Sequence, residues 1–166
     1  MKDKKSSMIL RLTMGILMML ALGLAPVVSA GDGPIVRYST QDRFESVRES
    51  VELAITGRGM VISSVSHVGE MLERTGKDLG ATRQVYRQAE IVEFCSAAVS
   101  RRMMEADPHN IVSCPFSIAI YVLSEEPDTV YLAYRRPVSA TPGKSEEALR
   151  AVEELLDGIV QDALAF

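Results

Sequence analysis

Alternation of apolar and polar side chains in the segment from Ile111 to Leu123 constrains the fold more than any other feature of this 166-residue chain. The clearest part of it runs in the order Phe116, Ser117, Ile118, Ala119, Ile120, Tyr121 and Val122. A second alternating run covers Thr129 to Arg135, after a turn that contains Pro127. Because residues two apart in a strand share one face, the two runs predict an antiparallel hairpin with one apolar face. Other secondary-structure elements must pack on that apolar face to bury it.

The C-terminal segment is predicted to supply part of that cover. Ser145 can cap a helix whose first turn carries Glu146 and Glu147, where acidic side chains are favourable. Apolar residues recur along one stripe of this helix, at Ala148, Val152, Leu155, Leu156, Ile159 and Ala163. At about 1.5 Å per residue the stripe is roughly 30 Å long, which is enough to cross a sheet.

The other segments alternate between strand and helix patterns. Strands are predicted at 34–38, 60–65 and 86–94, and helices at 41–56, 67–74 and 96–106. Ser39 and Asp42 have the spacing of a capping box before the first helix, and Asp107-Pro108 ends the third. This order of elements predicts a single α+β domain over residues 31–166, a two-layer sandwich in which helices pack on one face of the sheet.

The first 30 residues have the pattern of an export signal. A basic start precedes an uncharged run from Leu12 to Ala25, and Val28-Ser29-Ala30 supplies the small residues that a signal peptidase requires. The alternative is a retained membrane anchor, but a span needs about 20 apolar residues and this run is shorter. We expect cleavage before Gly31 and a periplasmic product that is free of the membrane.

Charge narrows the range of partners. Removing residues 1–30 takes four basic residues and one acidic residue from a chain of formal net charge −4, which leaves −7. A protein this acidic has no general attraction for phosphate backbones, so nucleic acid is not an expected partner. The same repulsion disfavours anionic membrane surfaces.

Cys95 and Cys114 are the two cysteines of the chain. In ideal strands Cys95 shares the parity of Glu93 and Cys114 that of Phe116, which would place the thiols on opposite faces. A break at Pro115, or the end of the strand at Cys95, could bring them together. Three alternatives stay open: a structural disulfide, two buried reduced thiols, and a redox or metal-binding pair.

Metal and catalytic chemistry have weaker support. His67 and Met71 have the i, i+4 spacing that places two side chains on one helical face, and both residue types suit copper. Methionines at helical spacing are, however, usually core residues. No nucleophile motif accompanies either histidine, and the sequence contains no Gly-rich phosphate loop. We predict no cofactor and no catalytic residues, and an enzyme is not the expected class.

The second face of the predicted sheet mixes small, aromatic and charged side chains. The candidate binding residues on it are Glu93, Cys95, Ser117, Tyr121, Tyr131 and Arg135. Such a surface is too apolar for plain solvent exposure and too polar for a core, which is typical of a ligand groove or a subunit contact. The alternative is an ordinary sheet face that the short helices partly cover.

Three motifs connect the chain to a known family: Met71-Leu72-Glu73-Arg74-Thr75-Gly76, Phe94-Cys95-Ser96-Ala97 and Cys114-Pro115-Phe116-Ser117-Ile118-Ala119-Ile120-Tyr121. In these residues, and from roughly Arg37 to Leu164, the chain resembles the DUF302 family of uncharacterised bacterial domains and looks like an exported subgroup of it. The resemblance implies a TATA-binding-protein-like (TBP-like) fold, with a curved, mainly antiparallel sheet of about five strands on the long C-terminal helix. It also implies a tendency to form homodimers.

The resemblance bears on the cysteines as well. Antiparallel neighbours would place the end of the Cys95 strand beside the start of the Cys114 strand, which favours a disulfide. Position 97 is alanine where many members have proline, which weakens the transfer of a cysteine role from the family. The family implies no reaction and no cofactor.

Two hypotheses of function follow. The first is an exported, non-enzymatic domain that binds a small molecule or a protein partner through the sheet face defined above. The rival is a periplasmic redox or metal-handling accessory protein that uses Cys95 and Cys114, with His67 as a further candidate. Free-thiol and metal content would distinguish them.

Overall fold

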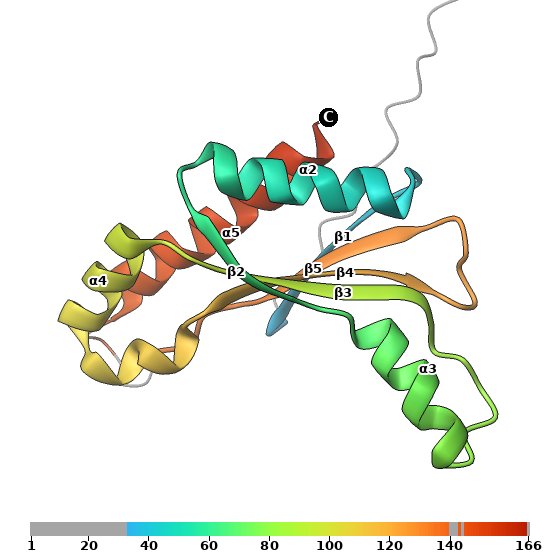
Figure 1. Ribbon diagram of the computed structural model, residues 1–166. Coiled ribbons are helices and arrows are strands. Elements are labelled where there is room, and N and C mark those ends of the chain that lie inside the picture. Colours follow the sequence, from blue (N-terminus) through green and yellow to red (C-terminus); the bar gives the residue numbers. More distant parts are fainter. Residues whose placement is uncertain (1–32, 140–142, 144, 166) are drawn as a thin grey trace, which may run out of the picture.

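Within the described part of the chain, a five-stranded antiparallel sheet forms the centre of the molecule (Figure 1). The computed structural model describes residues 33–139, 143 and 145–165. The strands are β1 (Ile35–Thr40), β2 (Val61–Ser66), β3 (Tyr86–Cys95), β4 (Phe116–Leu123) and β5 (Val130–Arg135). They lie in the order β1-β5-β4-β3-β2, and each neighbouring pair is antiparallel. The predicted hairpin is therefore the β4–β5 pair.

Two helices cover one face of this sheet. α2 (Phe44–Gly57) and α5 (Glu146–Leu164) lie on the same side and pack against each other (Figure 1). α4 (Ala97–Ala106) and the short 3-10 helix η1 (Pro108–Ser113) form one end of the domain. α3 (Val68–Asp78) projects on the opposite side of the sheet. The predicted α+β fold with a long C-terminal helix is confirmed.

The core lies between the sheet and these helices. Ile118 and Ile120 of β4 are fully buried, as are Val92 and Phe94 of β3. From the predicted stripe of α5, the buried residues are Val152, Leu156, Ile159 and Ala163, whereas Ala148 and Leu155 are only partly buried. Leu149 and Val160 are buried as well, because α5 contacts α2 and α4 in addition to the sheet.

α2 begins later than the capping box predicts. Ser39 is not a cap, because it lies in β1 opposite Tyr131. The helix starts at Phe44, and the Asp42 carboxylate accepts a hydrogen bond from the backbone N–H of Arg43 at 2.7 Å. Pairing with β5 extends β1 through Thr40, so the sheet overrides the local capping signal.

The predicted strand from Ile111 to Leu123 is wrong in its first part. Its first three residues belong to η1, and β4 starts at Phe116. The Asp107 carboxylate caps η1 by accepting a hydrogen bond from the N–H of His109 at 2.9 Å. Pro108 occupies the first helical position, which suits proline because that N–H has no helical partner. The Asp-Pro pair thus ends α4 and also starts a second short helix.

α3 is longer than predicted. It continues past the predicted end at residue 74 and ends at Asp78. Gly80 then takes a φ of +70°, a left-handed conformation that glycine adopts without strain. The helix therefore ends about one turn later than predicted.

The predicted signal peptide occupies residues 1–30, which lie outside the described residues. Cleavage and export therefore stay predictions. In the ranges that the structure describes, no helix is both long enough and apolar enough to span a bilayer.

Candidate ligand-binding groove

The open face of the sheet, which is the face turned away from α2 and α5, carries three rows of side chains. The strand register defines these rows. They are Ser64, Glu93, Ser117, Arg135 and Ile35; then Ser66, Ile91, Ala119, Ala133 and Arg37; and then Ala89, Tyr121, Tyr131 and Ser39. The centre of the middle row is Ala119 and Ala133. This row lies between one that carries Glu93 and Arg135 and one that carries two tyrosines.

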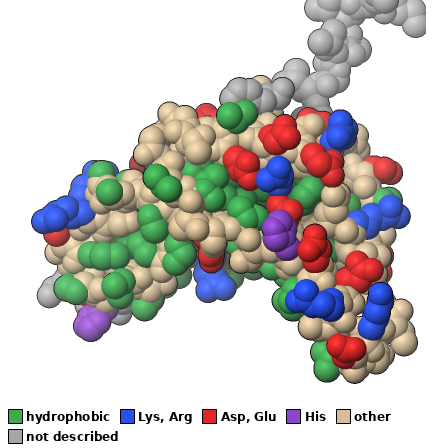
Figure 2. Space-filling view, in the orientation of Figure 1, with side chains coloured by type: hydrophobic (Ala, Val, Ile, Leu, Met, Phe, Trp, Pro, Cys, Tyr) green, Lys and Arg blue, Asp and Glu red, His purple; other side chains and the backbone are tan. Residues whose placement is uncertain are grey.

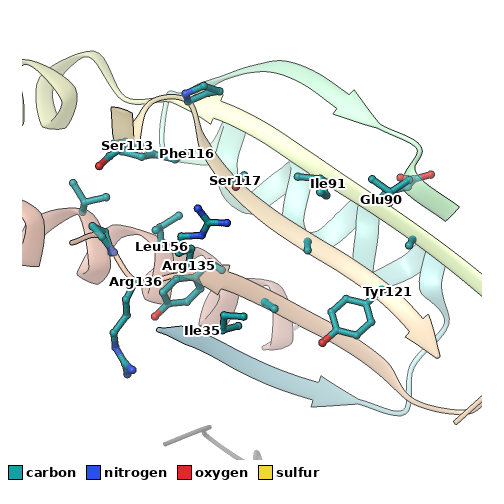
Figure 3. A pocket seen from close by; sticks show the side chains of 18 of the residues that line it. Ile35, Glu90, Ile91, Ser113, Phe116, Ser117, Tyr121, Arg135, Arg136 and Leu156 are labelled. Carbon is teal, nitrogen blue, oxygen red and sulfur yellow. The ribbon is translucent and has the colours of Figure 1, made fainter. Parts of the chain in front are cut away.

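β4 and β5 part at one end of this face. Their pairing covers Ala119–Val122 of β4, so the start of β4 and the end of β5 diverge. Ser117 and Arg135 lie on the two sides of this gap, and Leu156 of α5 lines its floor (Figure 3). The gap and the open face together form a groove of about 630 Å³. This volume suits a small-molecule ligand.

Elements outside the central strands close the two ends of the groove. At one end its lining residues are Val68 in the first turn of α3 and Tyr86 at the start of β3. A Cβ built on Gly69 would lie 2.8 Å from the backbone nitrogen of Ala89, so only glycine allows α3 to approach β3 this closely. At the other end the lining residues are Val112, Ser113, Pro115 and Val138. Figure 1 shows α3 and η1 projecting on either side of the open face.

Two of the three charged residues that line the groove contact ionisable neighbours. The Glu90 carboxylate contacts Nδ1 of His67 at 3.1 Å and Nε of Arg48 at 3.9 Å. The Arg136 guanidinium binds Glu153 at 2.7 Å. Acidic and basic side chains are also intermixed across the surface in view in Figure 2. The Arg136 charge is therefore paired within the protein, whereas Oε2 of Glu90 is buried without a hydrogen-bond partner.

Arg135 is the third charged lining residue, and it differs from the other two. Its side chain makes no ion pair and no hydrogen bond with any residue that the structure describes. Its guanidinium lies in the gap between β4 and β5, near Ser117 and Leu156 (Figure 3). A guanidinium presents a planar fork of donors that matches a carboxylate. The groove thus offers an available cation in a lining that is otherwise mostly apolar or aromatic.

Tyrosines lie at the far end of the open face from Arg135. The Tyr121 ring stacks on Tyr131 with 5.2 Å between centroids, and it meets Tyr86 edge-on at 5.7 Å. Arg37 lies 5.6 Å from the centroid of Tyr131, a cation–π contact. The pKa of Tyr121 is raised, mainly by burial. The pKa of Tyr131 is also raised, mainly by the hydrogen bond to Glu126. Both phenols are therefore neutral at physiological pH.

The predicted binding residues are only partly brought together. Three of the six line the groove, namely Ser117, Tyr121 and Arg135. The other three lie outside its lining. Glu93 and Tyr131 share the open face but bond elsewhere: Glu93 accepts from the Ser64 hydroxyl, and Tyr131 donates to Glu126. Cys95 ends β3 beyond the groove.

Cys95 and Cys114 are neighbouring free thiols. Cys95 is exposed, whereas Cys114 is half-buried and lies 3.4 Å, sulfur to hydroxyl oxygen, from Ser100. Burial raises the pKa of the Cys95 thiol, and the adjacent Cys114 raises it further. Ideal strand parity does not apply to this pair, because Cys114 lies before the start of β4, so the alternative of a break at Pro115 describes their placement. A disulfide between the two stays a prediction.

The structure does not assemble a metal site around His67 and Met71. His67 precedes α3 and its ring contacts Glu90, while the Met71 sulfur lies 4.0 Å from the Thr75 hydroxyl. The described residues contain no group of three or more His, Cys, Asp or Glu side chains suited to a metal ion. His67 follows the end of β2 opposite to the one that pairs with Cys95, so it does not join the thiols.

Sequence reasoning missed the lining residues that come from outside the central strands. They include Ile35, Val68, Pro115 and Val138. Ile35 had a usable signal, because alternation within β1 places it on one face with Arg37. That signal becomes informative only with the pairing of Ile35 to Arg135 across the β1–β5 ladder.

Comparison with known proteins identifies the family of this domain. A family model described as a domain of unknown function, DUF302, matches residues 36–163. The chain belongs to the DUF302 family. The match extends from β1 to the end of α5, so the groove is part of the DUF302 domain itself. Among curated proteins, none matches the chain significantly.

A solved structure shares the fold of this DUF302 chain. It is the crystal structure of an uncharacterized conserved protein DUF302 from Bacillus stearothermophilus, with a TM-score of 0.65 and 15% sequence identity. The similarity covers 78% of this chain and 98% of that one. At this identity the likeness shows the fold alone.

Proposed function

We propose that this DUF302 domain binds an elongated anionic amphiphile in the groove, with the acidic group at Arg135 and the apolar body along the open face. The observation that carries the proposal is the unpartnered Arg135 guanidinium in the gap between β4 and β5. A cation in a mostly apolar groove favours a ligand that supplies the missing negative charge. The Ser117 hydroxyl across the gap can donate a further hydrogen bond to a carboxylate.

The apolar body has a path along the strands. Ala119 and Ala133 leave space in the middle of the open face, and Ile91 lines its side. From Ser117 to Tyr121 the strand rises about 13 Å, at about 3.3 Å per residue. A ligand of about this length would meet the Tyr121 ring with its apolar end and Arg135 with its acidic end.

The proposal includes a location outside the cytoplasm. The signal pattern of residues 1–30 supports it, and it would place the chain in an exported subgroup of the family. The TBP-like curvature and the homodimer stay predictions of the family resemblance.

Decanoate, an unbranched carboxylate, is a suitable probe for titration calorimetry. We expect saturable binding to the wild type and at least about tenfold weaker binding to Arg135→Gln, because a charge-assisted hydrogen bond contributes about 1.5–3 kcal/mol. Ala119→Trp should abolish binding by filling the middle of the groove. Decanol, which has the same chain without the charge, should bind no more tightly to the wild type than decanoate binds to Arg135→Gln.

The matched control is Arg102→Gln, which removes the same charge from an exposed position on α4. Its decanoate affinity should stay close to that of the wild type. Equal affinity of the two glutamine variants would contradict the proposal, and so would the absence of saturable binding to the wild type.

A further inference from the structure

The β3–β4 ladder brings the two cysteines together at a place outside the groove. Phe94 pairs with Phe116 at the last position of this ladder. One residue further, the same register sets Cys95 opposite Pro115, which is next to Cys114 in the chain. The strand register therefore juxtaposes the thiols independently of any single side-chain rotamer.

The two thiols differ in accessibility. Cys95 is exposed, and on its other side it pairs with Val61 of the edge strand β2. Cys114 is half-buried, packs against the hydrophobic core and contacts the hydroxyl of Ser100. An external reagent therefore meets Cys95 first, while Cys114 is held beside it.

We propose that Cys95 and Cys114 form a redox-active dithiol that exchanges with external disulfides, with Cys95 as the entry thiol and Cys114 as the resolving thiol. The Cys95 thiolate attacks a disulfide R–S–S–R, forms a mixed disulfide and releases one R–S⁻, which takes up a proton. The Cys114 thiolate then attacks the Cys95 sulfur, forms the Cys95–Cys114 bond and releases the second R–S⁻. Two protein thiols are oxidised and the external disulfide is reduced to two thiols, so electrons and protons balance.

The surroundings of Cys95 affect the rate of such an exchange. Burial and the neighbouring Cys114 raise its pKa, so the thiolate fraction at neutral pH is small. The exchange should therefore be slow at neutral pH and should accelerate as the pH rises toward the thiol pKa.

Oxidised glutathione is the probe, with intact mass and free-thiol titration as the readouts on purified reduced protein. The wild type should lose two hydrogens in mass, lose both free thiols and retain no glutathione. Cys114→Ser should instead hold one glutathione on Cys95, because the resolving thiol is missing. Cys95→Ser should react at least about tenfold more slowly, because its remaining thiol is half-buried.

Circular dichroism should show that both serine variants fold. If one of these variants does not fold, the wild type is used in its place. It is alkylated briefly with iodoacetamide and analysed by peptide mapping, and Cys95 should be labelled before Cys114. Wild-type protein that accumulates glutathione adducts, or that keeps both thiols while its unfolded form loses them, would overturn the proposal. Neither result depends on decanoate binding, so the thiol and groove proposals fail separately.

Discussion

The two faces of the central sheet use the same strands for different purposes. On β4, Ile118 and Ile120 face the helices and are 0% exposed, whereas Ser117 and Ala119 alternate with them on the open face and are partly exposed. The covered face is filled with branched and aromatic side chains. The open face combines small residues with an unpaired Arg135. Burial explains the composition of the covered face but does not explain the composition of the open face.

This difference teaches where to look for function. Side chains that face α2 and α5 must fit a close-packed core, so substitutions there are expected to change stability. On the open face, an available guanidinium, small residues and a stack of tyrosines contribute little to a core. Their arrangement around a groove is typical of a binding site. Substitutions on the two faces should therefore affect different measurements.

The largest effect is expected from a deletion on the covered face. Ile120→Ala removes a fully buried side chain and should lower the free energy of unfolding by about 2–5 kcal/mol. The matched change on the open face is Ser117→Ala, which should alter that free energy by less than about 0.5 kcal/mol. Urea denaturation of both variants makes the measurement. Similar losses would remove the distinction between the two faces.

An intermediate effect is expected where α3 meets the open face. Gly69→Val should cost about 1–3 kcal/mol in urea denaturation, because its side chain would collide with the backbone of Ala89. It should also weaken decanoate binding by displacing Val68 from the groove. Gly57→Ala is the control, since a Cβ there meets nothing within 4 Å, and it should leave stability unchanged or raise it by about 0.4–1 kcal/mol. A stable Gly69→Val variant with unchanged binding would show that α3 does not shape the groove.

The smallest effect concerns a polar contact on the covered face. The Tyr134 hydroxyl donates to the Asp157 carboxylate at 3.0 Å, and Tyr38 donates to the same oxygen. Tyr134→Phe should cost about 1 kcal/mol at neutral pH, because it removes one hydrogen bond. Urea denaturation at neutral pH makes this measurement.

The same variant should change the response to alkali. Burial, followed by the Asp157 hydrogen bond, raises the pKa of Tyr134 in the folded state above its value of about 10 in the unfolded chain. The unfolded state therefore releases this proton first, and stability present below pH 10 is lost as the pH rises above it. Tyr134→Phe should show a shallower alkaline loss of stability than the wild type. Parallel pH profiles would contradict this assignment.

Local patterns predicted the covered half of the sheet correctly. The β4–β5 hairpin follows from alternation, and Ser96 caps α4 as its residue type suggests, by accepting from the N–H of Val99 at 3.5 Å. The errors have a common cause. Ser39 was available as a cap but pairs with β5 instead. Tertiary pairing competes with local signals, and its energy is not visible within a short segment.

The candidate groove was predictable only in its central part. Ser117, Tyr121 and Arg135 follow from strand parity, because their strands are neighbours joined by a short turn. Val68 and Val138 come from segments far apart in the chain, and no periodicity connects them. The neighbouring position of Cys95 and Cys114 was implied by the family resemblance, and the antiparallel β3–β4 register agrees with it.

By itself, the sequence determined the α+β class, the apolar face that α5 covers and the membership of the DUF302 family, because each depends on short-range periodicity or on motifs. Only the tertiary structure decided that β4 and β5 part beside Arg135 and that α3 closes the groove at Gly69. Both features depend on where strands and helices distant in the chain meet. Such contacts are set by packing of the whole domain, which no local pattern encodes.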